Sequence, residues 1–119
     1  MRERRRSLRF VLPGKVCLVF GEHRFELPIA DLSVSGVGVR LDLALLGERP
    51  DGRVGTCRIE SPELSGPVEA FVSVMRIRRF ASRHLVGLRF VSIGDEELRI
   101  IEAYEAARRT SLSESSSKS

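Results

Sequence analysis

Short runs of alternating hydrophobic and polar residues fill most of the chain, and the pattern changes near the C-terminal end. A period of two is typical of strands that bury one face. Segment 36–43 is the clearest case, because its odd-numbered positions carry Val or Leu while its even-numbered positions carry Gly, Arg or Asp. Gly and Pro separate the other β-rich segments, which are residues 15–20, 24–32, 53–60, 67–78 and 84–90. Several short strands joined by such turns, with a loop at 44–52, predict a mainly β domain built as a small antiparallel barrel or sandwich.

The pattern becomes helical after residue 94. Acidic residues occupy 95–97 and arginines occupy 108–109. Negative charge at the start and positive charge at the end of a helix both interact favourably with its dipole. Apolar residues recur there with the i, i+3 spacing of one helix face, at Leu98, Ile101 and Tyr104. We therefore predict a helix over 95–109 that packs on the barrel. Residues 110–119 contain six serines, and we expect a disordered tail there.

The length of 119 residues fits one domain. We divide it into an arginine-rich arm at 1–9, a folded part at 10–109 and the tail at 110–119. No run reaches the ~18 apolar residues of a membrane span, and no apolar stretch follows the basic start as in a signal peptide. We therefore expect a cytoplasmic protein. Cys17 and Cys57 lack metal-ligand spacing, which favours reduced, partly buried thiols and leaves a disulfide or a reactive thiol as alternatives.

The net charge of +4 is modest, but its distribution is uneven. Five arginines lie in the first nine positions, and only Lys15 and Lys118 are lysines. Like charges in an apolar-poor segment predict a mobile arm. Arginine forks suit phosphates and the O6/N7 edge of guanine, and Arg5 and Arg9 have an RxxxR spacing. Alone, such an arm is usually a solvated or nonspecific polyanion-binding segment, and genome composition could equally explain the arginine bias.

A second polar element, Asp31-x-Ser33-x-x-Gly36, interrupts the apolar alternation. A carboxylate can accept both N–H groups on the Watson–Crick edge of guanine, and a hydroxyl can donate to a phosphate or a base acceptor. Alone, the element could be a turn in which Asp and Ser bond to nearby backbone groups. Together with the arm it predicts a receptor for a guanine nucleotide that carries phosphates. Phe10 could anchor the end of the arm to the core.

These elements together resemble the PilZ domain family, bacterial receptors for cyclic di-GMP. The resemblance covers about residues 4–109 and is carried by RRxxxR at 4–9, DxSxxG at 31–36 and HLVGLRF at 84–90. It implies a single-domain member with a six-stranded antiparallel β-barrel and a C-terminal α-helix. The last of the three segments is similar to the closing barrel strand of the family.

The resemblance also implies roles for individual residues. The RxxxR pair would grip guanine and phosphate, with a preceding arginine that some members use when they bind an intercalated ligand dimer. The Asp and Ser would contact guanine from the barrel surface, and the Gly would leave room for the ligand. The expected ligand-binding residues are Arg4, Arg5, Arg9, Asp31, Ser33 and Gly36.

Three further arginines are weaker candidates: Arg6 in the arm, Arg40 and Arg76. Arg40 shares the strand face of Gly36 and Gly38 and could reach a second nucleotide, although a solvated side chain is the simpler interpretation. Some members stack a base on a later-strand aromatic residue, and this chain has no Trp. The guanidinium of Arg76 could stack on guanine instead, with an exposed strand arginine as the alternative.

The resulting hypothesis is a cyclic di-GMP receptor or adaptor whose arm becomes ordered on the nucleotide and which signals to an unidentified protein partner. The alternative is a ligand-independent PilZ-type interaction module. Binding of DNA or RNA through the arm is not favoured, because the charge is modest and the helix begins with acidic residues. We expect neither an enzyme nor a metal or cofactor. His23 and His84 are solitary, and no His or Lys accompanies Asp31 and Ser33 as a catalytic relay would require.

Overall fold

A computed structural model describes residues 9–41, 54–80 and 83–118, with side chains at 9–41, 54–77 and 84–110. The predicted loop at 44–52 and the arm residues before Arg9 lie outside these ranges. The elements are β1 (Lys15–Phe20), β2 (His23–Ser33), β3 (Gly36–Leu41), β4 (Val54–Glu60), β5 (Val68–Phe80), β6 (Arg83–Ile93) and α1 (Asp95–Lys118).

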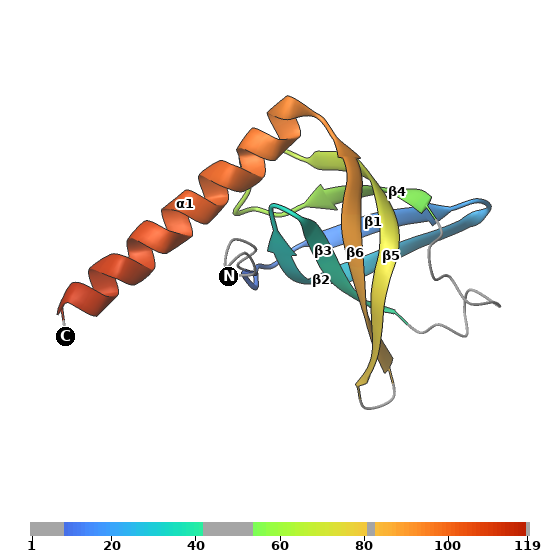
Figure 1. Ribbon diagram of the computed structural model, residues 1–119, viewed down its shortest axis with the longest axis horizontal. Coiled ribbons are helices and arrows are strands. Elements are labelled where there is room, and N and C mark those ends of the chain that lie inside the picture. The colour runs from blue at the N-terminus through green and yellow to red at the C-terminus, as the bar shows by residue number, and fades with distance from the viewer. Residues whose placement is uncertain (1–8, 42–53, 81–82, 119) are drawn as a thin grey trace, which may run out of the picture.

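All neighbouring strands are antiparallel, and they close a barrel in the order β1-β2-β3-β6-β5-β4 (Figure 1). The six-stranded barrel with a C-terminal helix predicted from the resemblance is therefore confirmed. The turn predicted after β1 is also confirmed: Gly21 has φ 58°, a left-handed conformation that glycine adopts without steric cost.

The alternation in the sequence places one face of every strand in the barrel interior. Val37, Val39 and Leu41 of β3 are at most 1% exposed, as the pattern at 36–43 predicts. Val, Leu, Ile and Phe side chains of the other strands complete the core. Cys57 lies in this core and Cys17 is partly exposed, and both thiols are free. Burial raises the pKa of the Cys57 thiol to about 12, partly offset by a hydrogen bond with the backbone of Ala70.

Three β-bulges interrupt the strand pairing, and two of them change which residues of the future site face outward. Ile29 pairs with Val39 and Asp31 pairs with Gly38, so one extra residue, Ala30, stands between two positions that face opposite ways. A bulge of this kind reverses the inside-outside order of the strand that follows it. Ile29 consequently points into the core, whereas Asp31 is on the outer face.

The second bulge lies in β5. Val74 pairs with Leu88 and Arg76 pairs with Gly87, which leaves Met75 as the extra residue. Val74 and Leu88 are buried, while Met75 and Arg76 are both exposed. The bulge therefore turns Arg76 to the same outer face as Asp31.

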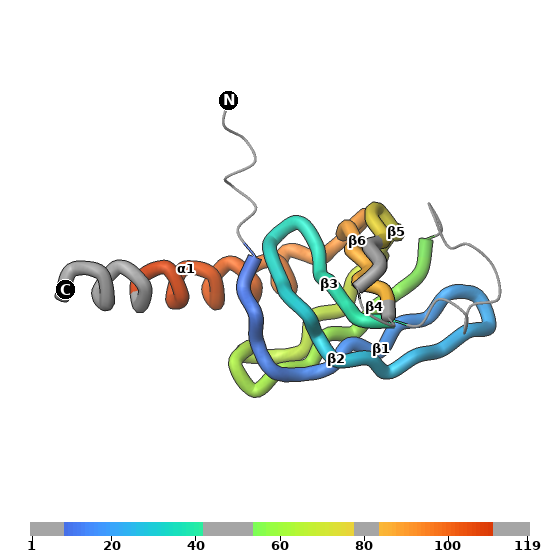
Figure 2. Tube along the Cα trace, turned by 90° about the horizontal axis from the view of Figure 1, so that it is seen from below, coloured from blue at the N-terminus to red at the C-terminus, as the bar shows by residue number. Residues whose placement is uncertain are grey.

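Helix α1 closes one end of the barrel and then continues beyond it (Figures 1 and 2). Ile101 is 1% and Tyr104 is 8% exposed, which confirms the predicted packing face at these two positions. The Phe10 ring meets Tyr104 edge-on at 6.0 Å, and the Arg108 guanidinium lies 5.7 Å from the same ring centre. The backbone of Phe10 also exchanges two 2.9 Å hydrogen bonds with Leu32. The predicted anchoring of the arm by Phe10 is thus confirmed.

The structure corrects the C-terminal boundary of the helix. The sequence predicted an end near Arg109 followed by a disordered tail, whereas the helix continues to Lys118. Segment 110–118 contains neither Gly nor Pro, the two residues that most strongly terminate helices. Serine, which suggested a tail by its abundance, costs only a fraction of a kcal/mol per residue in a helix.

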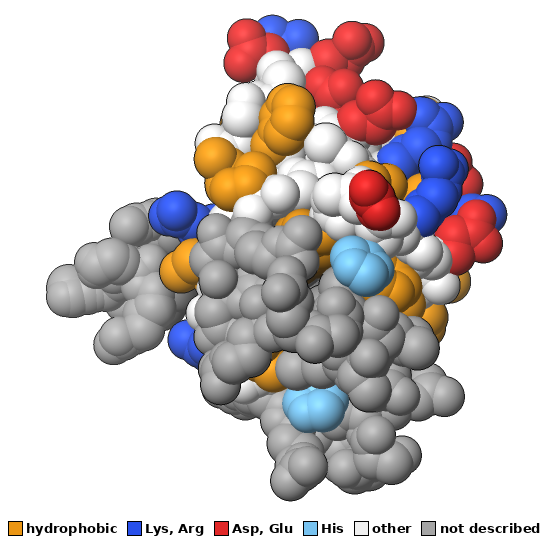
Figure 3. All heavy atoms as spheres, turned by 90° about the vertical axis from the view of Figure 1, so that its right-hand side faces the viewer, with side chains coloured by type: hydrophobic (Ala, Val, Ile, Leu, Met, Phe, Trp, Pro, Cys, Tyr) orange, Lys and Arg blue, Asp and Glu red, His pale blue; other side chains and the backbone are white. Residues whose placement is uncertain are grey.

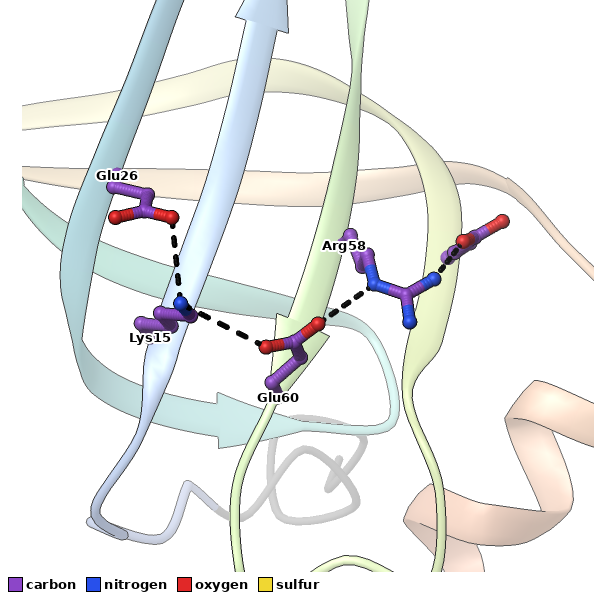
Figure 4. Close-up of polar contacts among 5 residues, drawn as sticks. Lys15, Glu26, Arg58 and Glu60 are labelled. Carbon is purple, nitrogen blue, oxygen red and sulfur yellow. Dashed lines mark hydrogen bonds and ion pairs between the residues drawn. The ribbon is translucent and has the colours of Figure 1, made fainter.

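A line of alternating charges crosses the outer face of β2, β1, β4 and β5 (Figure 4). Lys15 Nζ lies 3.3 Å from Glu26 and 3.9 Å from Glu60, and Arg58 Nε donates to Glu60 at 2.8 Å. The other end of Arg58 pairs with Glu69. Hydrogen bonds with Glu60 and Glu69 raise the pKa of Arg58, and the bond from Arg58 lowers the pKa of Glu60. Arg58 and Glu60 both lie on β4, whereas the other three pairs match charges across strands and so favour the observed register.

Candidate nucleotide-binding groove

A groove of about 540 Å³ runs over the outer face of β2, β3, β6 and β5. One transverse row of paired residues forms it. Asp31 pairs with Gly38, Gly38 pairs with Gly87, and Gly87 pairs with Arg76. Neighbouring strands are ~4.8 Å apart, so Asp31 and Arg76 are separated by about 14 Å along the sheet. An acid and a base therefore face each other across a floor of two glycines.

The two glycines keep this floor flat for different reasons. A Cβ on Gly38 would lie 2.6 Å from Asp31 Oδ1, so its absence makes room for the carboxylate. A Cβ on Gly87 would meet only Arg76, at 3.6 Å, which is ordinary contact. Because the fold leaves space above Gly87, a flat ligand could lie directly on the backbone there.

Arg9 closes the groove above Asp31. Its Nη1 donates to Asp31 Oδ1 at 2.6 Å, and the two side chains are 41% and 25% exposed. Only one guanidinium nitrogen and one carboxylate oxygen take part in this bond. Arg9 can therefore still donate, and Asp31 can still accept, hydrogen bonds from a ligand. The structure brings together these two predicted residues, which are 22 positions apart in sequence.

Two of the predicted residues have structural roles beside the groove. Ser33 is 1% exposed; its Oγ accepts from the Ser35 N–H at 3.2 Å and donates to the Gly36 carbonyl at 3.4 Å. A Cβ on Gly36 would stand 2.0 Å from the Leu88 carbonyl oxygen. Ser33 thus holds the turn between β2 and β3, and Gly36 permits the close approach of β6. Contact of either residue with a ligand stays a prediction.

The remaining candidates divide into three groups. Arg76 lines the groove, whereas Arg40 is exposed on β3 outside the lining. Arg4, Arg5 and Arg6 lie outside the described residues, so their roles stay predictions.

Seven residues of the groove lining were not predicted from the sequence: Ser35, Gly38, Met75, Leu85, Gly87, Leu88 and Arg89. Gly38 and Gly87 could have been found from the sequence, because a glycine inside a strand often marks the close approach of a ligand. A further signal is the spacing of three between core residues at Ile29 and Leu32, which indicates a bulge instead of regular alternation. Arg89 follows Gly87 on the outer face of β6 and could have been found once that face was known.

The groove lining carries three arginines, Arg9, Arg76 and Arg89, against one carboxylate, Asp31. This excess of positive charge suits an anionic ligand. Among the residues whose side chains are described, no group of His, Cys, Asp and Glu could hold a metal ion. The described part of the chain also has no helix that is long and apolar enough to cross a membrane.

Comparison with protein families matches residues 3–107 to the PilZ domain. The chain belongs to the PilZ domain family. A search of curated proteins finds no match. The resemblance drawn from the arginine arm, the DxSxxG element and the β6 segment is therefore confirmed at the level of the family.

Solved structures with this fold include two longer bacterial proteins. The inhibitor of motility MotI from Bacillus subtilis superposes with a TM-score of 0.76 and 18% identity over 92% of this chain and 53% of its own. Escherichia coli YcgR in complex with c-di-GMP superposes with a TM-score of 0.74 and 18% identity, over 98% of this chain and 50% of its own. This chain thus spans about half the length of either protein. The PilZ domain of YcgR with c-di-GMP is matched over 93% of this chain and 98% of its own, with a TM-score of 0.66 and 18% identity.

Proposed function

We propose that this PilZ domain is a cyclic di-GMP receptor and that the nucleotide binds over Gly38 and Gly87. The observation that carries the proposal is the contact between Arg9 and Asp31 at one end of a glycine-floored groove. Cyclic di-GMP in complex with YcgR, which shares the fold, supports the choice of ligand.

The chemistry of guanine matches this contact. The Watson–Crick edge offers N1–H and N2–H to a carboxylate, and the adjacent edge offers O6 and N7 to a guanidinium. The two edges meet between N1 and O6, so an Asp and an Arg that touch each other can serve the same base. Adenine carries an acceptor at N1 and cannot satisfy Asp31 in this way. The pair therefore predicts preference for guanine over adenine.

The rest of the groove suits the remainder of the dinucleotide. The base can lie on the open backbone of Gly87 beside the Asp31 carboxylate, which covers Gly38, and Arg76 and Arg89 line the groove where a second base or the phosphates would extend. We infer that Arg4, Arg5 and Arg6 join the ligand as the arm closes over it. Arm and nucleotide would then become ordered together and form a new surface for a protein partner. The free thiols fit a reducing compartment such as the cytoplasm.

Calorimetric titration with cyclic di-GMP tests the receptor proposal. Cyclic di-AMP, which differs in its bases, is the control ligand. We expect saturable heat with the guanine ligand only. Arg9→Ala and Asp31→Ala should each remove most of the signal, whereas Arg99→Ala, which replaces an exposed arginine of α1 outside the groove, should not. Absence of heat at high micromolar protein would overturn the proposal.

Trypsin tests the closing of the arm, because the arm is rich in arginines at which the protease cuts. Nucleotide should slow cleavage within residues 1–9 without changing cleavage elsewhere. Equal cleavage with and without bound nucleotide would show that the arm does not close on the ligand.

A ligand-independent interaction module remains the second candidate, favoured by the structural roles of Ser33 and Gly36. Two of the three defined residues of the DxSxxG element, Ser33 and Gly36, serve the turn and the β3–β6 contact, so folding alone could account for their presence. This candidate predicts a partner that binds equally well after Arg5 and Arg9 are both replaced by Ala. The receptor proposal predicts that the same double variant loses nucleotide-dependent binding.

A further inference from the structure

A second groove lies on the other side of β5, away from the nucleotide groove. It has a volume of about 590 Å³ and extends from β2 across the outer faces of β1, β4 and β5 to β6 and the start of α1. A transverse row of paired residues forms its floor: Arg24, Val19, Thr56, Phe71 and Ser92. The nucleotide groove shares none of these residues.

Apolar side chains are exposed along this second groove. Phe71 in its lining is 53% exposed, Val54 two positions from Thr56 on β4 is 57% exposed, and Val91 beside Ser92 is 50% exposed. Val91 is the extra residue of a third bulge, between the pairs Phe71–Ser92 and Val72–Phe90. Figure 3 shows hydrophobic side chains gathered on one face of the molecule, next to charged ones. Clustered exposed apolar groups with a polar rim are typical of protein-interaction surfaces.

The charges at the two ends of the groove have opposite sign. Arg58 and Glu69 in the lining neutralise each other. Among the described side chains Arg24 makes no ion pair, and neither does Glu97 at the opposite end. Glu97 belongs to the acidic first turn of α1, with Asp95 and Glu96. The groove therefore has a positive end on β2, an apolar middle and a negative end at α1.

We propose that this groove binds an extended segment of a partner protein, with an acidic residue against Arg24, apolar residues on Val19 and Phe71, and a basic residue against the start of α1. Four strand spacings of ~4.8 Å give a row of about 19 Å, and an extended chain advances ~3.3 Å per residue. About six residue steps therefore separate the charged ends of the segment, with about five residues between them. A concave surface accepts an inserted segment better than a second copy of the same concavity, which argues against self-association through this face.

Selection from a phage-displayed library of random twelve-residue peptides tests the proposal. Phages that bind the Phe71→Ser variant are removed first, so that the remaining peptides depend on the groove. We expect enriched peptides to carry an acid and a base on either side of apolar residues. Their dissociation constants should rise at least tenfold with Phe71→Ser and with Arg24→Glu. Lysine in place of the acidic peptide residue should restore binding to Arg24→Glu. Val11→Ser should change nothing, because Val11 is 74% exposed but lies outside both grooves.

Several outcomes would overturn the proposal. Failure to enrich any peptide, or equal binding to the wild type and to Phe71→Ser, would remove the groove as a docking site. Failure of the charge exchange would show that Arg24 does not contact the segment. A dimer in sedimentation equilibrium that Phe71→Ser abolishes would make a second copy the occupant. Cyclic di-GMP titration of Phe71→Ser should match the wild type, so loss of peptide binding is separable from failure of the nucleotide site.

Discussion

Replacing Gly87 by Ala separates ligand contact from folding at the floor of the nucleotide groove. The new Cβ would lie 3.6 Å from Arg76 Cβ and 3.7 Å from its carbonyl oxygen, so the native backbone accommodates it. Glycine inside a strand is less stable than Ala by about 0.5–1 kcal/mol. The free energy of unfolding should therefore stay the same or rise within that range, and the melting temperature should rise by no more than about 4 °C.

Ligand binding should respond in the opposite direction. A base lying on the backbone of Gly87 would be lifted by the methyl group and would lose its close contact with the backbone. Forcing an extra methyl group into a close-packed contact costs about 1–3 kcal/mol, which corresponds to an increase in dissociation constant of roughly 5-fold to 150-fold. Calorimetric titration with cyclic di-GMP measures this change directly.

Gly66→Ala is the matched control. Its Cβ would also stand 3.6 Å from its nearest neighbour, Ile100 Cδ1, and Gly66 is outside the groove. Thermal unfolding of both variants should be alike, and only Gly87→Ala should weaken nucleotide binding. A folded Gly87→Ala protein with wild-type affinity would show that no ligand group lies on this floor.

Three further predictions concern other residues of the site and the core. Asp31→Asn should weaken the binding of cyclic di-GMP at least tenfold, as measured by calorimetry. The free energy of unfolding should change by only about 0–1 kcal/mol, because the ion pair between Asp31 and Arg9 is partly exposed. A large loss of stability would show that Asp31 serves the fold instead. Gly36→Ala should destabilise by about 1–3 kcal/mol in chemical denaturation, since its Cβ would collide with the Leu88 carbonyl, and an unchanged midpoint would contradict the close approach. Burial raises the pKa of Cys57 from 9.0 to about 12, so above pH 9 the unfolded chain loses the thiol proton while the folded protein keeps it. The free energy of unfolding should therefore fall above pH 9, with a slope of at most about 1.4 kcal/mol per pH unit. Cys57→Ala should lack this part of the decline, and identical pH profiles would exclude the effect.

Local physical chemistry made most of the fold readable from the sequence. The strict alternation at 36–43 requires one face in a core and one outside, and Val37, Val39 and Leu41 are buried as expected. The helix beginning at Asp95 follows from its acidic first turn and apolar spacing. Closure into a six-stranded barrel came from the family resemblance, because alternation alone is equally compatible with a sandwich.

The candidate site divides in the same way. Arg9 and Asp31 could be named from the sequence, because their residue types and spacing express a guanine-recognition chemistry. Their contact across 22 positions depends on the bulge at Ala30, which turns Asp31 outward. A bulge arises from pairing with a neighbouring strand, so no local propensity specifies it.

The amino-acid order by itself therefore determined which segments become strands, where the helix starts and which side chains carry the chemistry. Strand pairing decided the rest: it aligned Asp31, Gly38, Gly87 and Arg76 in one row and brought Gly36 against Leu88 of β6. The physical reason is that register joins residues far apart in the chain, and a shift of one position reverses the face of every side chain that follows.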